Sequence, residues 1–208
     1  MIKIIPAILA KTYEEFESMV RKIEPYADLV HLDITDGDFV PNKTIGGYEE
    51  LMKIDTNLNF EVHLMVNNPE SQISRWLETK AVRFLIHWES TKEYDTVINQ
   101  FGVHGKEFGF VFNPQTDYSA IEQYIDKVDL VQFLTVAPGF YSSPFVPEVL
   151  EKIRNFHIQY PAKIIQVDGG IKPETVKLVE AAGVSSAAVG SYIFQNEDIG
   201  KALEDLYV

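Results

Sequence analysis

The sequence predicts an α/β fold, a single-domain (β/α)8 TIM barrel in which parallel strands alternate with helices. Short apolar runs rich in β-branched residues alternate with longer helical segments from one end of the chain to the other. Eight such runs divide the 208 residues into units of about 26, close to the minimum for a strand with its crossover helix. An open doubly wound sheet is the competing architecture, and the count of eight favours the barrel. We therefore expect one barrel domain over residues 1–208.

The predicted strands are apolar along nearly their whole length, as expected for strands that are buried on both faces of a parallel sheet. They cover residues 2–9, 29–34, 60–66, 82–87, 108–112, 130–136, 164–167 and 187–189. Helices are predicted between them over residues 13–23, 69–77, 118–124, 147–156 and 173–182. Several of these helices begin at a proline, which the first turn of a helix tolerates because its N–H has no intrahelical partner.

Composition and charge restrict the classes of partner. A hydrophobic fraction of 46% with 12% aromatic residues excludes a disordered chain. The absence of cysteine excludes disulfides, a thiol nucleophile and a thiolate metal site. A formal net charge of −13 argues against nucleic acid and anionic lipid as partners. The apolar run at residues 1–5 is too short for the core of a signal peptide and meets Pro6 at once, and no apolar run approaches the ~20 residues of a membrane span. We therefore expect a cytoplasmic protein with no membrane partner.

Four polar residues stand at the ends of predicted strands, where a parallel barrel builds its active site. His31 and Asp33 end the second strand and share one face, His63 lies in the third, and Asp168 ends the seventh. A single buried histidine is readily explained as a hydrogen-bonded core residue. Two imidazoles and two carboxylates buried together without a cation would cost several kcal/mol, which favours a site. This donor set suits one divalent cation such as Zn²⁺, Fe²⁺, Mn²⁺ or Co²⁺.

The two carboxylates of this group also suggest a reaction. Asp33 and Asp168 come from strands that are well separated around the ring, so a substrate carbon can lie between them. One carboxylate can remove a proton from one face of that carbon while the other delivers a proton to the opposite face. A metal held beside them would stabilise the intervening enediolate. The arrangement therefore predicts epimerisation next to a carbonyl group.

Two other turns carry polar residues whose roles are less direct. His87 and Glu89 follow the fourth predicted strand, and we expect them to face the substrate or to support residues that do. The simpler alternative is that they line the barrel mouth and bond each other or the backbone. Trp88 between them is predicted to pack between barrel and helices. Asp36 is predicted to hold the turn at Gly37 rather than to take part in catalysis.

Glycines follow the last three predicted strands. Gly139 lies after the sixth strand, Gly169 and Gly170 after the seventh, and Gly190 with Ser191 after the eighth. Each glycine alone is explained as a turn residue, but loops at these positions are the recurrent phosphate site of such barrels. Backbone N–H groups hold a phosphate without any net positive charge. An acidic chain is therefore compatible with a phosphorylated substrate.

Seven motifs spread over nearly the whole chain carry a family resemblance. They are residues 6–9 (PAIL), 31–42 (HLDITDGDFVPN), 61–66 (EVHLMV), 113–114 (NP), 135–140 (TVAPGF), 167–173 (VDGGIKP) and 189–191 (VGS). In these motifs, most specifically the second, the chain resembles the ribulose-phosphate 3-epimerases, metal-dependent barrels of the pentose phosphate pathways. The resemblance implies a barrel of the ribulose-phosphate-binding type and a homo-oligomer, either dimer or hexamer.

The resemblance also implies residue roles. The positions that match the family's metal ligands are His31, Asp33, His63 and Asp168, and the acid and base match Asp33 and Asp168. Those that match its phosphate-binding positions are Gly169, Gly170, Gly190 and Ser191. Met65 matches a methionine beside the reacting carbon, and Gly139 begins the loop that closes over substrate. The implied reaction interconverts D-ribulose 5-phosphate and D-xylulose 5-phosphate through a cis-enediolate.

The chain also departs from the family pattern at the predicted site wall. Ala7 stands where the family has serine, Thr35 and Leu134 where it has methionine, and Asp38 where it has histidine. Residues 141–143 replace a glycine-rich stretch of the closing loop. These differences leave metal ligands and proton carriers intact but leave the substrate open. The alternatives are an allulose-6-phosphate 3-epimerase and a sugar-phosphate-binding barrel without turnover.

Overall fold

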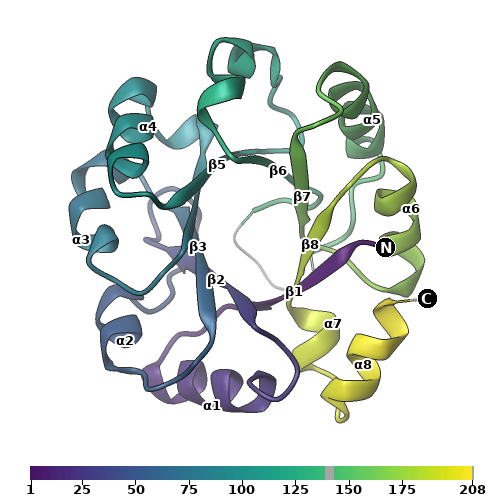
Figure 1. The fold of residues 1–208 in the computed structure, drawn as a ribbon. Helices are drawn as coiled ribbons and strands as arrows, with labels where there is room; N and C mark the ends of the chain where they lie inside the picture. The colour runs from purple at the N-terminus through teal and green to yellow at the C-terminus, as the bar shows by residue number, and fades with distance from the viewer. Residues whose placement is uncertain (139–142, 208) are drawn as a thin grey trace.

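The computed structural model describes residues 1–138 and 143–207. Within these ranges eight parallel strands pair in chain order, and β8 pairs with β1 to close the barrel (Figure 1). The strands are β1 (Lys3–Ile8), β2 (Leu29–Thr35), β3 (Asn59–Met65), β4 (Arg83–His87), β5 (Glu107–Phe112), β6 (Leu130–Leu134), β7 (Ile164–Asp168) and β8 (Ser186–Val189). The predicted (β/α)8 barrel is confirmed, and the alternative of an open doubly wound sheet is wrong, because pairing of the first and last strands leaves no open edge.

Helices surround the strands as an outer ring (Figure 1). The α-helices are α1 (Tyr13–Ile23), α2 (Tyr48–Lys53), α3 (Ile73–Leu77), α4 (Tyr94–Val103), α5 (Val149–Gln159), α6 (Pro173–Ala181), α7 (Ser191–Phe194) and α8 (Ile199–Leu206). Three 3₁₀ helices complete them: η1 (Pro69–Ser71), η2 (Trp88–Ser90) and η3 (Ser119–Lys127). In the ranges that the structure describes, none of the helices has the length and apolar character needed to cross a membrane.

Two of the predicted helices differ in kind from the observed ones. The segment 69–77 divides into η1 and α3, because the Asn68 carbonyl accepts from the backbone and hydroxyl of Ser71 while the Gln72 N–H turns to Pro69. The segment 118–124 forms η3 rather than an α-helix. Lys152 Nζ donates to three carbonyl oxygens of the chain before η3, which holds that stretch as a loop.

Successive side chains along β2 and β3 alternate between the outer and the inner face of the barrel wall. Val30, Leu32 and Ile34 on β2 and Phe60, Val62 and Leu64 on β3 point outward and join the main apolar core against the helices. Burying side chains of this size contributes roughly 1.5–3 kcal/mol each. The intervening residues of the two strands point into the barrel. The outward positions therefore stabilise the wall, and the inward positions are available for chemistry.

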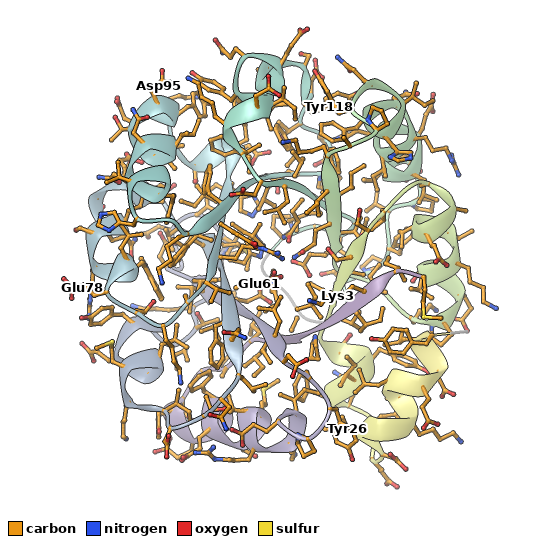
Figure 2. All side chains as sticks on the ribbon, viewed as in Figure 1. Lys3, Tyr26, Glu61, Glu78, Asp95 and Tyr118 are labelled. Carbon is orange, nitrogen blue, oxygen red and sulfur yellow. The ribbon has the colours of Figure 1, made fainter. Side chains whose placement is uncertain are left out.

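The barrel interior is part apolar and part polar. A small separate apolar cluster consists of Leu85, Val111, Leu130 and Leu134. Beside it lie buried polar side chains: Glu61, Gln132, Gln166 and Ser186. Figure 2 shows Glu61 near the centre of the barrel, whereas Glu78 and Asp95 lie at the periphery. A layer of polar side chains thus crosses the interior of the barrel.

Candidate functional site

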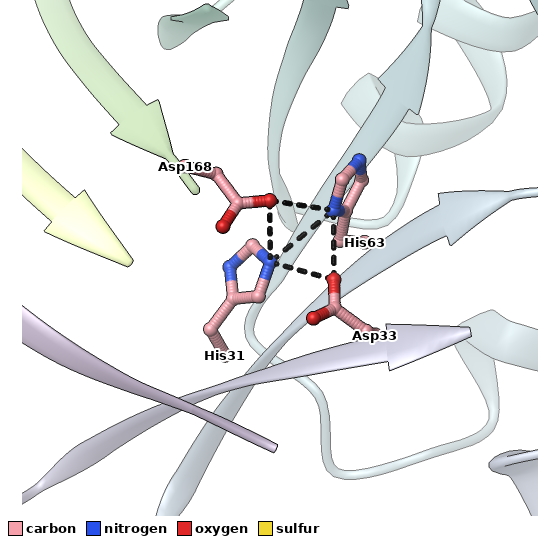
Figure 3. A group of neighbouring side chains, drawn as sticks. All are labelled: His31, Asp33, His63 and Asp168. Carbon is pink, nitrogen blue, oxygen red and sulfur yellow. Dashed lines mark hydrogen bonds and ion pairs between the residues drawn. The ribbon is translucent and has the colours of Figure 1, made fainter. Parts of the chain in front are cut away.

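Four side chains meet inside the barrel at the carboxyl ends of its strands (Figure 3). Asp33 on β2 and His63 on β3 are register partners, so their side chains lie side by side. His31 Nε2 is 3.2 Å from both Asp33 Oδ1 and His63 Nδ1. His63 Nδ1 is 2.9 Å from Asp33 Oδ1 and 3.5 Å from Asp168 Oδ2. Figure 3 shows the two aspartates at opposite corners of the group with the histidines between them.

The spacing of these atoms fits a common cation. Each of the four residues offers one ligand atom, and all four atoms lie within 4.8 Å of one another. The contacts between these atoms run from 2.9 Å, between His63 Nδ1 and Asp33 Oδ1, to 4.0 Å, between His31 Nε2 and Asp168 Oδ2. Ligand atoms arranged tetrahedrally at about 2.1 Å from a metal lie about 3.4 Å from one another. The chemistry and the spacing of the donor set therefore both fit a divalent transition metal.

The electrostatic environment of these buried groups favours positive charge at the centre of the cluster. Burial lowers the pKa of His31, but Asp33 and Glu61 outweigh it and hold this pKa well above its ordinary value. Burial likewise lowers the pKa of His63, and hydrogen bonds to Asp168 and Asp33 raise it above its ordinary value. Burial raises the pKa of Asp33, but the two histidines bring it below its ordinary value. The carboxylates thus attract a cation to the point where the ring nitrogens meet.

Glu61 contacts His31 inside the barrel, and it is a site residue for which the sequence motifs predicted no role. Its Oε1 lies 2.7 Å from His31 Nδ1, and its Oε2 accepts a hydrogen bond of 2.7 Å from Arg83 Nη1. Burial raises the pKa of Glu61, but His31 and Arg83 bring it below its ordinary value, so Glu61 is a carboxylate. With Nδ1 directed to Glu61, His31 presents Nε2 to the cluster. The available signal was its position two residues before His63, on the same face of β3.

His87 and Glu89 contact both the cluster and each other. His87 Nε2 lies 3.0 Å from His63 Nε2, and its Nδ1 lies 3.2 Å from Glu89 Oε2. Burial lowers the pKa of His87 to about 4, so the ring is neutral. Burial raises the pKa of Glu89, but hydrogen bonds from His87 and Thr116 bring it to about 2. Between them Trp88 packs against Tyr94 and Phe112, as predicted.

A cavity opens above the cluster and contains both of its aspartates. The residues that line it are Ala7, Leu9, Asp33, Met65, Leu134, Val136, Pro138, Ser143, Asp168, Gly169, Gly170, Ile171, Ala188, Gly190 and Ser191. Every predicted substrate-binding residue that the structure describes is in this set. Gly139 and residues 140–142 of the predicted closing loop lie outside the described residues. Two of the family departures, Ala7 and Leu134, form part of the cavity wall.

The turn after β7 requires glycine. Gly169 has φ 101° and Gly170 has φ 66°, both in the left-handed region. A Cβ atom on Gly169 would lie 2.2 Å from Val136 Cγ2. The Thr135 hydroxyl bonds the carbonyl oxygens of Asp168 and Gly169, which fixes the backbone directly beneath the aspartate. The same turn therefore positions a cluster carboxylate and a stretch of backbone that faces the cavity.

Asp36 organises the loop after β2. Its Oδ1 accepts from the backbone N–H groups of Asp38 and Phe39, each at 2.8 Å, and its Oδ2 accepts from that of Asn67 at 2.8 Å. Burial raises the pKa of Asp36, but these donors bring it below its ordinary value. The predicted turn role at Gly37 is confirmed, and the bond to Asn67 extends it by joining the loops after β2 and β3.

The chain is similar along nearly its full length to proteins named as epimerases. Ribulose-phosphate 3-epimerase of Bacillus subtilis (strain 168) is 34% identical over 213 residues, covering 99% of this chain and 98% of that protein. The enzyme of that name from Schizosaccharomyces pombe is 31% identical, covering 98% and 92%. The chloroplastic ribulose-5-phosphate-3-epimerase of Arabidopsis thaliana is 33% identical, covering 99% and 76%.

Solved structures support the fold, and a family model identifies the family. A 3-hexulose-6-phosphate synthase superposes with a TM-score of 0.74 at 16% identity, covering 99% of this chain and 98% of the other. The orotidine 5'-monophosphate decarboxylase of Sulfolobus solfataricus superposes with a TM-score of 0.63 at 14% identity, covering 99% and 96%. The model of the Ribulose-phosphate 3 epimerase family matches residues 3–194. The chain therefore belongs to the ribulose-phosphate 3-epimerase family.

Proposed function

We propose that this protein is a metal-dependent ketose-phosphate 3-epimerase that interconverts D-ribulose 5-phosphate and D-xylulose 5-phosphate. The observation that carries the proposal is the pair of aspartates at opposite corners of a His/Asp cluster, both facing a cavity that glycine turns complete. Full-length similarity to proteins named ribulose-phosphate 3-epimerase supports this reaction and this pentose. By the same resemblance we expect a cytoplasmic homo-oligomer built from one barrel domain per chain.

The metal would be held by His31 through Nε2, His63 through Nδ1, and one oxygen each of Asp33 and Asp168. This set of two neutral nitrogens and two carboxylate oxygens suits Zn²⁺, Fe²⁺, Mn²⁺ or Co²⁺. When bound, such an ion supplies Lewis-acid stabilisation of the negative charge that develops on the substrate oxygens. The residues themselves bind the ion and carry the protons.

The two aspartates exchange the proton at C3. One carboxylate takes the C3 proton, and the electron pair of the broken C–H bond moves into the C2–C3 bond to give a cis-enediolate. The other aspartate, which is protonated, then donates its proton to the opposite face of C3 and the carbonyl reforms. Because Asp33 and Asp168 come from β2 and β7 on opposite sides of the cluster, each serves as base in one direction of the reaction.

The remaining cavity residues orient the substrate. Backbone around Gly169, Gly170, Gly190 and Ser191 would receive the phosphate, since all four line the cavity that contains the aspartates. Met65 lines the same cavity and would pack beside the reacting carbon, where an apolar side chain keeps water from the enediolate. The phosphate thereby fixes the distance from the anchored end of the sugar to C3.

Hydrogen exchange at C3 tests this function directly. Metal-stripped protein reloaded with Co²⁺ is incubated with D-ribulose 5-phosphate in D₂O, and we expect deuterium at C3 together with formation of D-xylulose 5-phosphate. Stripped protein is the control and should give neither. Faster turnover of allulose 6-phosphate than of D-ribulose 5-phosphate would show that the hexulose phosphate is the preferred substrate. Binding of ketose phosphates without exchange would show that the protein binds sugar phosphates without turnover.

A further inference from the structure

The ring of His63 is held at both of its nitrogens. Nδ1 faces Asp33 and Asp168 in the cluster, while Nε2 lies 3.0 Å from His87 Nε2 on the neighbouring strand β4. His87 Nδ1 in turn lies 3.2 Å from Glu89 Oε2. Glu89 Oε1 accepts the backbone N–H of Asn113 at 3.0 Å. Both rings are completely buried, whereas the Glu89 side chain is 23% exposed, so the chain of contacts runs from the cluster toward solvent.

Only one arrangement of hydrogens satisfies all of these contacts once Nδ1 of His63 binds a metal. Nδ1 then supplies a lone pair, so the hydrogen of the His63 ring is on Nε2. Because the two Nε2 atoms lie 3.0 Å apart, Nε2 of His87 must accept this hydrogen and carries none itself, so the hydrogen of the His87 ring is on Nδ1. That hydrogen points to Glu89, and an ionised carboxylate can only accept. The donors therefore run in one direction from His63 through His87 to Glu89.

The opposite arrangement conflicts at both ends. If His87 carried its hydrogen on Nε2, its Nδ1 lone pair would face the carboxylate of Glu89 at 3.2 Å. His63 would then have to accept at Nε2, and its own hydrogen would move to Nδ1, into the position that a cation needs. Glu89 therefore excludes this state without touching the cluster.

We propose that His87 and Glu89 are positioning residues that hold His63 in the tautomer and ring orientation in which Nδ1 faces the metal centre. The proposal rests on the metal centre proposed above. His31 is held differently, since the carboxylate of Glu61 contacts its Nδ1 directly and leaves Nε2 for the cluster. The two histidines thus use different ring nitrogens. Each is oriented by its own carboxylate: His31 directly by Glu61, and His63 by Glu89 through the imidazole of His87.

Binding of Co²⁺ alone to the metal-stripped full chain tests the proposal, with the visible absorption of the bound ion as a spectroscopic readout. His87→Leu removes the acceptor for His63 Nε2–H, and we expect about 10- to 100-fold weaker Co²⁺ binding with a changed absorption spectrum. His87→Gln places an amide oxygen near the position of Nε2, and we expect it to restore most of the affinity and the spectrum. Phe84→Leu on β4 is the matched control, because Phe84 packs outward against Phe101 and its loss should leave Co²⁺ binding unchanged.

Glu89→Gln tests the far end of the chain. Glu89 accepts hydrogen bonds on both oxygens, from His87 on Oε2 and from Asn113 on Oε1, and a further one from Thr116, whereas glutamine has only one oxygen to offer. The amide must therefore direct its NH₂ group at one of these donors, and we expect weaker Co²⁺ binding than in the unchanged protein. Nitrogen-15 spectra of labelled histidines in the Zn²⁺-loaded protein should show His87 with its hydrogen on Nδ1.

The outcomes separate this proposal from the metal centre on which it rests. If the unchanged protein binds Co²⁺ and His87→Leu binds it with the same affinity and spectrum, the positioning role is wrong and the metal centre stands. A hydrogen on Nε2 of His87 in the Zn²⁺-loaded protein would overturn the proposal in the same way. Failure of the unchanged protein to bind Co²⁺ would overturn both.

Discussion

The His/Asp cluster and the glycine turns face the same cavity but are built by different means. In the cluster, side chains supply the functional groups, and each histidine contacts a further polar side chain: Glu61 for His31 and His87 for His63. In the turns after β7 and β8, glycines bring the backbone itself to the cavity, and left-handed φ values at Gly169 and Gly170 make this possible. The cluster therefore depends on the identity of side chains, and the turns depend on their absence.

This difference predicts different consequences of substitution. A change in the cluster leaves the backbone in place and removes a charge or a proton carrier, so it should act on the chemical step. A change in the turn after β7 introduces atoms where Val136 and Phe145 lie close to the glycines, so it should act on stability and on substrate binding. Four substitutions test this contrast.

The largest effect is expected in the cluster. Asp33→Asn and Asp168→Asn each remove one of the two carboxylates that we propose as proton carriers, and we expect kcat for D-ribulose 5-phosphate to fall roughly 10²- to 10⁴-fold. Steady-state kinetics with saturating Co²⁺ and a measurement of bound metal would follow the loss. Asp38→Asn, at an exposed carboxylate on the loop that follows β2, serves as the control. Unchanged turnover in either cluster variant would remove that aspartate from the mechanism.

An intermediate effect is expected in the turn after β7. Gly169→Ala forces a side chain into the left-handed region and against Val136, and we expect the free energy of unfolding to fall by roughly 1–3 kcal/mol, with a raised KM. Gly46→Ala is the matched control, since a Cβ there meets no atom within 4 Å. Urea unfolding of both variants measures the difference. Equal stability of the two variants would show that the turn can be made with a side chain.

The smallest effect is expected at Asp36, whose carboxylate accepts hydrogen bonds from backbone N–H groups of the loops after β2 and β3. Asp36→Asn leaves a single side-chain oxygen for backbone N–H donors that bond both carboxylate oxygens in the unchanged protein. We expect the free energy of unfolding to fall by about 1 kcal/mol at neutral pH. Because the pKa of Asp36 is depressed in the folded state, its contribution is complete above the unfolded pKa and is lost as the pH falls through the folded pKa. The stability difference between the two proteins should therefore shrink below about pH 4. If this stability difference stayed constant down to acid pH, ionisation of the Asp36 carboxylate would not be its cause.

The strands and the cluster were predictable because both follow from short periodicities. Each predicted strand ends within two residues of the observed one, and the alternation that sends Leu32 outward also sends His31 and Asp33 inward. The alternation along β3 indicates that Glu61 points into the barrel, but not which groups it meets there, since its partner Gln166 lies 105 residues away and meets it only when the barrel closes. The same holds for His87. The sequence places this histidine at the end of the fourth strand, but it does not show which ring nitrogen faces His63.

The polar layer inside the barrel has a consequence for assembly of the fold. Gln166 Nε2 on β7 donates to Glu61 on β3 and to Gln132 on β6, and Ser186 on β8 donates to Gln166 Oε1. A fragment ending after β4 would contain His31, His63 and Glu61 but not the Gln166 amide that reaches Glu61 from the opposite wall. Two half-barrels expressed as separate chains would therefore recognise each other by matched hydrogen bonds as well as by apolar contact. Slipping one half by a single residue would turn this layer out of the interior and leave Glu61 without its amide partner.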